Sequence, residues 1–144
     1  MDQQAVASYY VLYRLAQQGF DASATTGGQA ELVACSDDGR RVVLVRVRTR
    51  DRGSRFNVTA ADRRPAGRNV AYVFVDFDTG GGEPNVFVLR GARVTSLLET
   101  DPGWPRDARA FAEFDDSREA WHLLGLSGRS SVRSQGAVSS SPVL

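Results

Sequence analysis

The segment from Arg40 to Arg50, RRVVLVRVRTR, alternates charged and apolar side chains in a way that strongly constrains its conformation. Successive side chains of a β-strand point to opposite faces, so this alternation predicts a strand with two chemically different faces. One face carries Arg46, Arg48 and Arg50. The other face carries Val43, Val45 and Val47. We therefore expect the valines to join a core, and the fold must also accommodate three neighbouring guanidiniums.

The residues before this strand predict its antiparallel neighbour. The sequence SDDG at 36–39 is typical of a β-hairpin turn, because an Asp-Gly pair readily adopts positive φ. The preceding AELVACS alternates in the same way, with apolar residues on one face and Glu31 on the other. The carboxylate of Glu31 should consequently lie close to Arg46 or Arg48 across the hairpin.

The remaining sequence predicts one sheet covered by helices. A helix is expected from Gln4 to Gln18, where apolar side chains recur every three or four residues. The nearly continuous apolar segment from Val70 to Asp76 predicts a strand buried on both faces. The other expected elements are an extended piece at 20–25, a long loop at 51–68 with a short extended piece at 56–58, a strand at 85–90, and helices at 92–99 and 115–124. This order predicts an α/β fold with a single mixed β-sheet flanked by helices.

The length and composition are those of one globular domain, which we expect to span residues 1–126. Residues 127–144 are rich in serine and lack apolar periodicity, so they predict a disordered tail. No apolar run is long enough to cross a bilayer, and the N-terminus lacks the pattern of a signal peptide. The single cysteine, Cys35, cannot form an intramolecular disulfide. These features predict a cytoplasmic protein without a membrane partner.

All eighteen basic residues are arginine, and none is lysine. A G+C-rich genome is enough to explain the bias, but every cation is then a planar, permanently charged donor suited to phosphate and carboxylate. The charge is also unevenly distributed. Residues 40–68 hold ten arginines and two acids, whereas residues 76–119 hold ten acids and five arginines. Such asymmetry indicates a basic face that meets an anionic partner and an acidic face elsewhere.

Several catalytic and cofactor motifs are absent from the sequence. It contains no phosphate-binding loop, no dinucleotide-binding fingerprint and no paired zinc motif. A serine or cysteine triad needs a histidine, and His122 is the only one. A lone helical histidine is far more often a surface or half-buried residue than a catalyst, and nothing local connects it with Cys35.

Three acids remain as candidates for a metal site. Glu31 fits either a cross-strand ion pair or a ligand for a divalent cation. The ion pair is the favoured interpretation, because a single carboxylate makes a poor magnesium site. Asp76 and Asp78 come at the end of the apolar strand and are interpreted as solubilising residues rather than ligands, although strand ends do host sites.

The chain resembles the PD-(D/E)XK nuclease superfamily, particularly its small bacterial members. The resemblance is carried by YYVLYRLAQQGFDASA, TTGGQAELVAC and DDGRRVVLVRVRTR, with weaker support from VAYVFVDFD, NVFVLR and REAWHLLG. It covers residues 5–125 as pattern and spacing. It implies the restriction-endonuclease-like fold, which has an α-β-β-β-α-β core.

The motif positions of this superfamily are altered here. Its aspartate corresponds to Glu31, its glutamate or glutamine to Arg46, and its lysine to Arg48, with Thr49 following; a helical glutamate of some members corresponds to Ser8. In the superfamily, acids hold Mg²⁺ and the lysine helps to orient or activate water. Arg46 places a cation where a metal ligand should be, and Arg48 cannot release a proton. The resemblance therefore implies a catalytically inactive relative.

Three functional hypotheses follow, beside the simpler one that the arginines are only the solvated face of a sheet. The favoured hypothesis is an inactive nuclease-like domain that binds the backbone of DNA or RNA, or acts as a regulatory module, without a cofactor. Its expected contact residues are Arg46, Arg48, Arg50, Arg52, Arg55, Arg63, Arg64 and Arg68. The alternative is a protein-interaction module, as a homodimer or with an acidic partner. The third is a Mg²⁺-dependent endonuclease whose shifted site combines Glu31 with Asp76 or Asp78.

Overall fold

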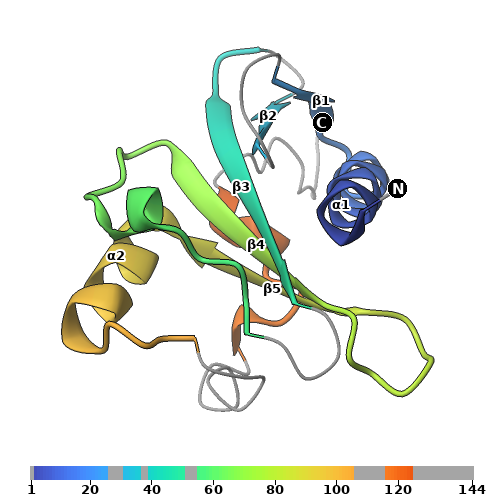
Figure 1. Cartoon of the computed structure of the whole chain (residues 1–144). Coiled ribbons are helices and arrows are strands. Elements are labelled where there is room, and N and C mark those ends of the chain that lie inside the picture. Colours follow the sequence, from blue (N-terminus) through green and yellow to red (C-terminus); the bar gives the residue numbers. More distant parts are fainter. Residues whose placement is uncertain (1, 26–30, 37–38, 51–54, 106–115, 125–144) are drawn as a thin grey trace, which may run out of the picture.

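A mixed sheet of five strands forms the centre of the protein, in the spatial order β1-β2-β3-β4-β5 (Figure 1). The computed structural model describes residues 2–25, 31–36, 39–50, 55–105 and 116–124. The strands are β1 (Asp21–Ala24), β2 (Glu31–Cys35), β3 (Val42–Arg50), β4 (Val70–Asp76) and β5 (Asn85–Arg90). Strands β3 and β4 are parallel, and the other neighbours are antiparallel. The predicted α/β class with a single mixed sheet is confirmed.

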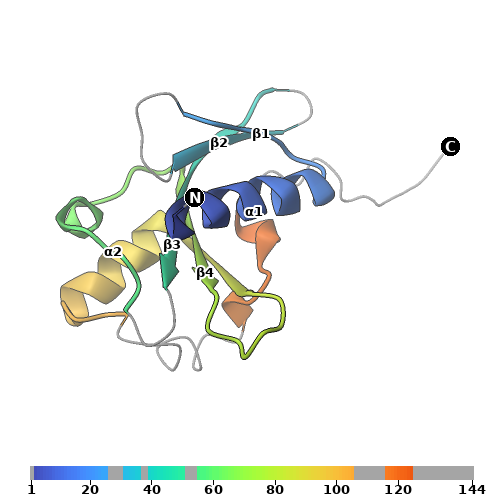
Figure 2. The same ribbon diagram turned by 45° about the vertical axis from the view of Figure 1, so that its right-hand side comes forward.

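Two α-helices cover the two faces of this sheet (Figure 2). Helix α1 (Gln3–Gln17) matches the predicted helix within one residue at each end. It begins where the side chain of Asp2 accepts a hydrogen bond from the N–H of Ala5, and the chain leaves it through Gly19, whose φ is +90°. Helix α2 (Gly91–Thr100) matches the second predicted helix and follows β5 directly.

Each face of the sheet has its own core. On the first face, the valines of β3 pack with α1 and with the 3₁₀ helix η3 (Trp121–Leu124). On the second face, Tyr72 and Phe74 of β4 pack with Phe56, Trp104 and α2. Because β4 contributes to both cores, its prediction as a strand buried on both faces is confirmed.

The predicted helix at 115–124 is wrong for residues 116–124, which the structure describes. Arg118 forms an isolated antiparallel bridge with Phe87, and the N–H of Glu119 donates to the carbonyl of Val86. Glu119 also has a φ of +54°, which an α-helix does not allow. Backbone groups that would bond within a helix therefore pair with the outer edge of β5, and the described residues 116–124 contain short 3₁₀ segments but no α-helix.

The connection from β3 to β4 also differs from the expected α-β-β-β-α-β order. Its described part, residues 55–69, contains the 3₁₀ helix η1 (Ala60–Arg63) and no α-helix. The expected extended piece at 56–58 is not a strand, although the N–H of Asn57 donates to the carbonyl of Thr49. Parallel strands are usually joined by an α-helix, so this crossover is unusually irregular.

Some expectations concern parts of the chain that the structure does not describe. Arg52 and the serine-rich residues 127–144 lie outside the described residues, as do Asp37 and Asp38 of the hairpin turn. Among the described helices, none combines the length and the apolar character needed to cross a membrane.

Candidate functional site

Strand β3 holds its arginines between two strands whose registers set their neighbours. Arg46 is paired with Glu31 of β2 on one side and with Tyr72 of β4 on the other. Four residues further along β3, Arg50 is paired with Asp76 of β4. The valines of β3 occupy the α1 side of the sheet, so alternation places the arginines on the side covered by η1 and α2.

Glu31 forms a cross-strand ion pair with Arg46, one of the two partners that the hairpin predicted. The Nε of Arg46 lies 3.1 Å from Oε2 of Glu31, and one Nη of Arg46 donates to the hydroxyl of Tyr72 over 3.0 Å. Both charged side chains are half-buried, with exposed fractions of 21% for Arg46 and 27% for Glu31. The guanidinium thus joins β2 to β4 across the face of β3.

Arg48 is paired with a carboxylate that sequence reasoning missed. Its Nε and Nη2 donate to the two oxygens of Asp62 over 2.8 and 2.6 Å, which is a bidentate geometry. Asp62 is completely buried and also accepts a hydrogen bond of 2.8 Å from the hydroxyl of Tyr72. It lies 3.9 Å from Arg46 as well, so the four charged side chains form one network with Tyr72 at its centre.

The position of Asp62 is set locally by the turn that carries it. Asp62 is the third residue of η1, and its side chain accepts a hydrogen bond of 2.9 Å from the N–H of Thr59. This arrangement is a capping box, in which the third residue of a helix satisfies a free N–H at its start. The sequence TAAD at 59–62 is the signal that could have located this turn. It could not have shown that Asp62 pairs with Arg48.

The network stabilises the charged form of its acid. Burial by itself raises the pKa of the Asp62 carboxyl, but the hydrogen bonds from Arg48 and Thr59 outweigh it and hold the pKa below its ordinary value of 3.8. Burial raises the pKa of Tyr72, and its bond to Asp62 raises it further against the opposing effect of Arg46. Burial disfavours the charge of Arg46, yet Tyr72 and two carboxylates raise its pKa overall. The guanidiniums of Arg46 and Arg48 therefore face the carboxylates of Glu31 and Asp62.

The third arginine of β3 is neutralised by the two acids at the end of β4. The Nε of Arg50 lies 3.0 Å from Asp76, and its Nη2 lies 3.5 Å from Asp78. Asp76 is 1% exposed, so its interpretation as a solubilising residue is wrong. A buried arginine beside it requires a buried carboxylate, because an unpaired charge in this core would be very costly.

The shifted metal site of the third hypothesis is not formed by the described residues. Glu31 lies beside Arg46 and Asp76 beside Arg50, four positions apart along β3, which corresponds to about 13 Å. A shared ion would need oxygen ligands within roughly 2.0–2.6 Å of its centre. In the part of the chain that the structure describes, no group of three His, Cys, Asp or Glu side chains is arranged to hold a metal ion.

The predicted basic face divides into a buried and an exposed set. Arg48 and Arg50 are 7% and 8% exposed, so the expectation that they contact nucleic acid is corrected: their guanidiniums are enclosed in ion pairs. The exposed set consists of Arg55, Arg63, Arg64 and Arg68, all on the connection between β3 and β4. We call these four residues the exposed loop arginines.

The remaining candidates lie elsewhere. Ser8 is on α1, which packs on the other face of the sheet and not beside Arg46 and Arg48. His122 is exposed on η3, as expected for a surface residue. Cys35 is a half-buried free cysteine at the end of β2.

Comparison with protein-family models, curated proteins and solved structures gives no match to this chain. The resemblance to the PD-(D/E)XK superfamily consequently has the residue pattern as its only basis.

Replacing Asp62 tests whether the network is a structural unit. Asp62→Asn leaves the buried guanidinium of Arg48 without its anion, so we expect the free energy of unfolding to fall by about 3–5 kcal/mol. The matched control Glu31→Gln breaks a half-exposed pair and should cost less than about 1 kcal/mol. Urea unfolding followed by circular dichroism measures both.

A double variant measures how strongly Arg48 and Asp62 stabilise each other. The double variant Arg48→Met, Asp62→Leu removes both charges, so that no buried charge is left without a partner. Its loss of unfolding free energy should therefore be smaller, by at least about 1 kcal/mol, than the sum of the losses in Arg48→Met and Asp62→Leu alone. Strict additivity, or an Asp62→Asn variant as stable as Glu31→Gln, would contradict the structural role.

The lowered pKa of Asp62 predicts a pH dependence of stability. Because its folded-state pKa lies below the ordinary 3.8, the unfolded state binds more protons in the acid range and stability rises with pH there. The contribution of Asp62 should be complete above about pH 5 and decrease as pH falls below 3.8. The stability difference between wild type and Asp62→Asn, measured from pH 7 to acid, should therefore shrink; a constant difference would refute this assignment.

Proposed function

We propose that this chain is a catalytically inactive nuclease-like domain, of the restriction-endonuclease-like fold, that binds the phosphate backbone of nucleic acid. The observation that carries the proposal is the division of the arginines: those at the motif positions are paired internally, while those on the β3–β4 connection are exposed. The succession of α1, three antiparallel strands and a parallel β4 is compatible with this fold, and η1 stands where it would have a helix.

The ion-pair network supports the absence of nuclease chemistry. A hydrolytic site of this kind needs anionic oxygens around a divalent cation. Here Glu31 faces the guanidinium of Arg46, and the carboxylate of Asp62 is chelated by Arg48. A divalent cation bound here would be repelled by the guanidiniums of Arg46 and Arg48. Arg48 also cannot act as a general base, because it keeps its proton at every accessible pH.

The exposed loop arginines support contact with backbone phosphates. Arg55 and Arg63 each donate one N–H to a carbonyl of the turn after α2, Arg55 to that of Gly103 and Arg63 to that of Pro102. These bonds tie the two guanidiniums to consecutive residues of one turn, and each retains further N–H donors, since a guanidinium has five. Arg64 extends the same exposed surface. Such contacts recognise phosphates without reading the base sequence.

A second candidate is a protein-interaction module, which a different surface favours. Helix α1 exposes three large apolar side chains, Val6, Tyr9 and Tyr13, with exposed fractions of 39%, 62% and 58%. Tyrosine is enriched at protein interfaces, and these residues lie on the side of α1 away from its core contacts Ala7 and Val11.

Duplex binding across a range of salt concentrations tests the proposed function. We expect a fluorescent duplex of arbitrary sequence to bind at low salt, with log K falling linearly with log salt concentration. The double variant Arg63→Gln, Arg64→Gln should weaken binding at low salt by roughly tenfold and reduce the salt slope by about two. Fluorescence anisotropy measures both quantities.

The matched control for this experiment is Arg93→Gln on α2, which also removes an exposed arginine. It should bind the duplex as wild type does. Absence of binding at low salt, or equal binding by the double variant, would reject the proposed function. Light scattering in the same buffers then tests the second candidate, for which self-association that depends on Tyr9 and Tyr13 is the expected result.

A further inference from the structure

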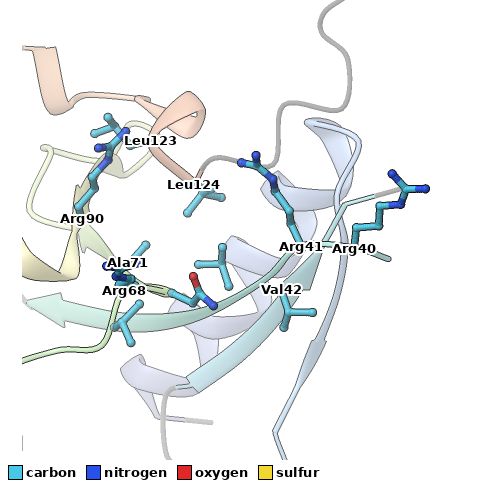
Figure 3. A pocket seen from close by; sticks show the side chains of 11 residues that line it. Arg40, Arg41, Val42, Arg68, Ala71, Arg90, Leu123 and Leu124 are labelled. Atoms are coloured by element: carbon cyan, nitrogen blue, oxygen red, sulfur yellow. The ribbon is translucent and has the colours of Figure 1, made fainter. Parts of the chain in front are cut away.

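A cavity of about 430 Å³ opens at the end of the sheet where β3 and β4 begin. The described residues that line it include four arginines: Arg40, Arg41, Arg68 and Arg90. In Figure 3, Leu124 lies between the side chains of Arg90 and Arg41, which rise on either side of it. None of the described residues that line the cavity is acidic.

The topology of the sheet explains why these arginines meet. Arg40 and Arg41 precede β3, and Arg68 precedes β4, which runs parallel to β3 and therefore starts at the same end. Arg90 ends β5, which runs antiparallel to β4 and is paired there with Ala71. Three strand ends thus bring cations from separate parts of the sequence to one place.

Two arginines of this cavity differ from those in the middle of β3. Arg46, Arg48 and Arg50 are each matched by carboxylates. Arg68 and Arg90 are exposed, and neither forms an ion pair with any residue that the structure describes. These two arginines give the described part of the cavity wall an excess of positive charge, which a polyanionic ligand would offset.

The walls indicate what kind of anion would fit. Guanidiniums bind phosphate oxygens in bidentate fashion, and several of them suit a group with more than one negative charge. The volume lies in the range of small-molecule sites and exceeds the need of one phosphate. Apolar side chains of Val43 and Leu124 and the carboxamide of Asn69 also line the cavity, so an organic part with polar edges can be held beside the phosphate.

We propose that this cavity binds the terminal phosphate of a nucleoside phosphate, either as a free nucleotide or at the end of a strand. The site goes beyond the proposed backbone contacts, because it shares only Arg68 with the exposed loop arginines. It is also a cavity, whereas those contacts are made by an exposed loop.

Isothermal titration calorimetry of the full chain at low salt, without added metal, tests the site with four probes. The probes are ADP, adenosine, a 5′-phosphorylated dinucleotide and the same dinucleotide without its phosphate. We expect at least one phosphorylated probe to bind, and its unphosphorylated counterpart to bind at least about tenfold more weakly. Comparing ADP with the phosphorylated dinucleotide distinguishes a free nucleotide from a strand end.

Two pocket variants and a control make the result specific. Arg68→Gln and Arg90→Gln should each weaken binding of the phosphorylated probe by about tenfold, because each removes a charged donor. Arg93→Gln, which removes an exposed arginine that does not line the cavity, should bind as wild type does. Thermal unfolding of each variant verifies that it is folded.

Failure of the cavity and failure of the backbone surface give different results. The cavity proposal is overturned if neither phosphorylated probe binds, if removing the phosphate changes nothing, or if Arg93→Gln weakens binding as much as Arg90→Gln does. Loss of duplex binding in the variant with Arg63 and Arg64 replaced, with unchanged binding of the phosphorylated probe, would separate the two sites.

Discussion

The buried ion pair between Arg48 and Asp62 is the interaction on which the arrangement of the α2 face depends. A guanidinium in a core of aromatic side chains is tolerated only beside a well-placed anion. Asp62 supplies that anion, and it can do so only because the turn around Thr59 brings the β3–β4 connection back over the sheet. The pair therefore links the strand, the crossover and the hydroxyl of Tyr72 in one unit.

This unit explains how a strand with three arginines on one face can be part of a folded core. Each guanidinium also packs near an aromatic ring: Arg46 and Arg48 lie 5.8 and 5.6 Å from the ring centre of Tyr72, and Arg50 lies 5.8 Å from that of Phe56. In the middle of β3, the positive charges form ion pairs within the protein. Available positive charge is found instead on the β3–β4 connection and around the cavity at the start of the strands.

Periodic segments of the sequence predicted most of the fold, because local chemistry determines them. The hairpin of β2 and β3 and the Glu31–Arg46 pair follow from alternation and turn residues. The doubly buried β4 follows from its continuous apolar run, and helix α1 from apolar side chains that recur every three or four residues. Asp62 did not follow, since it lies 14 residues from Arg48 in a connection without periodicity. The same limit applies to residues 116–124, whose backbone pairs with β5 through contacts that no local pattern encodes.

The central claim is that the arginines of β3 are structural while the exposed loop arginines are available to ligands. Nuclear magnetic resonance of the arginine Nε–Hε groups, during titration with a nucleic-acid duplex, tests it most directly. The resonances of Arg48 and Arg50 should be protected from solvent exchange and should not move, whereas those of Arg63 and Arg64 should shift. Rapid exchange of the Arg48 resonance, or its displacement by the duplex, would contradict the account.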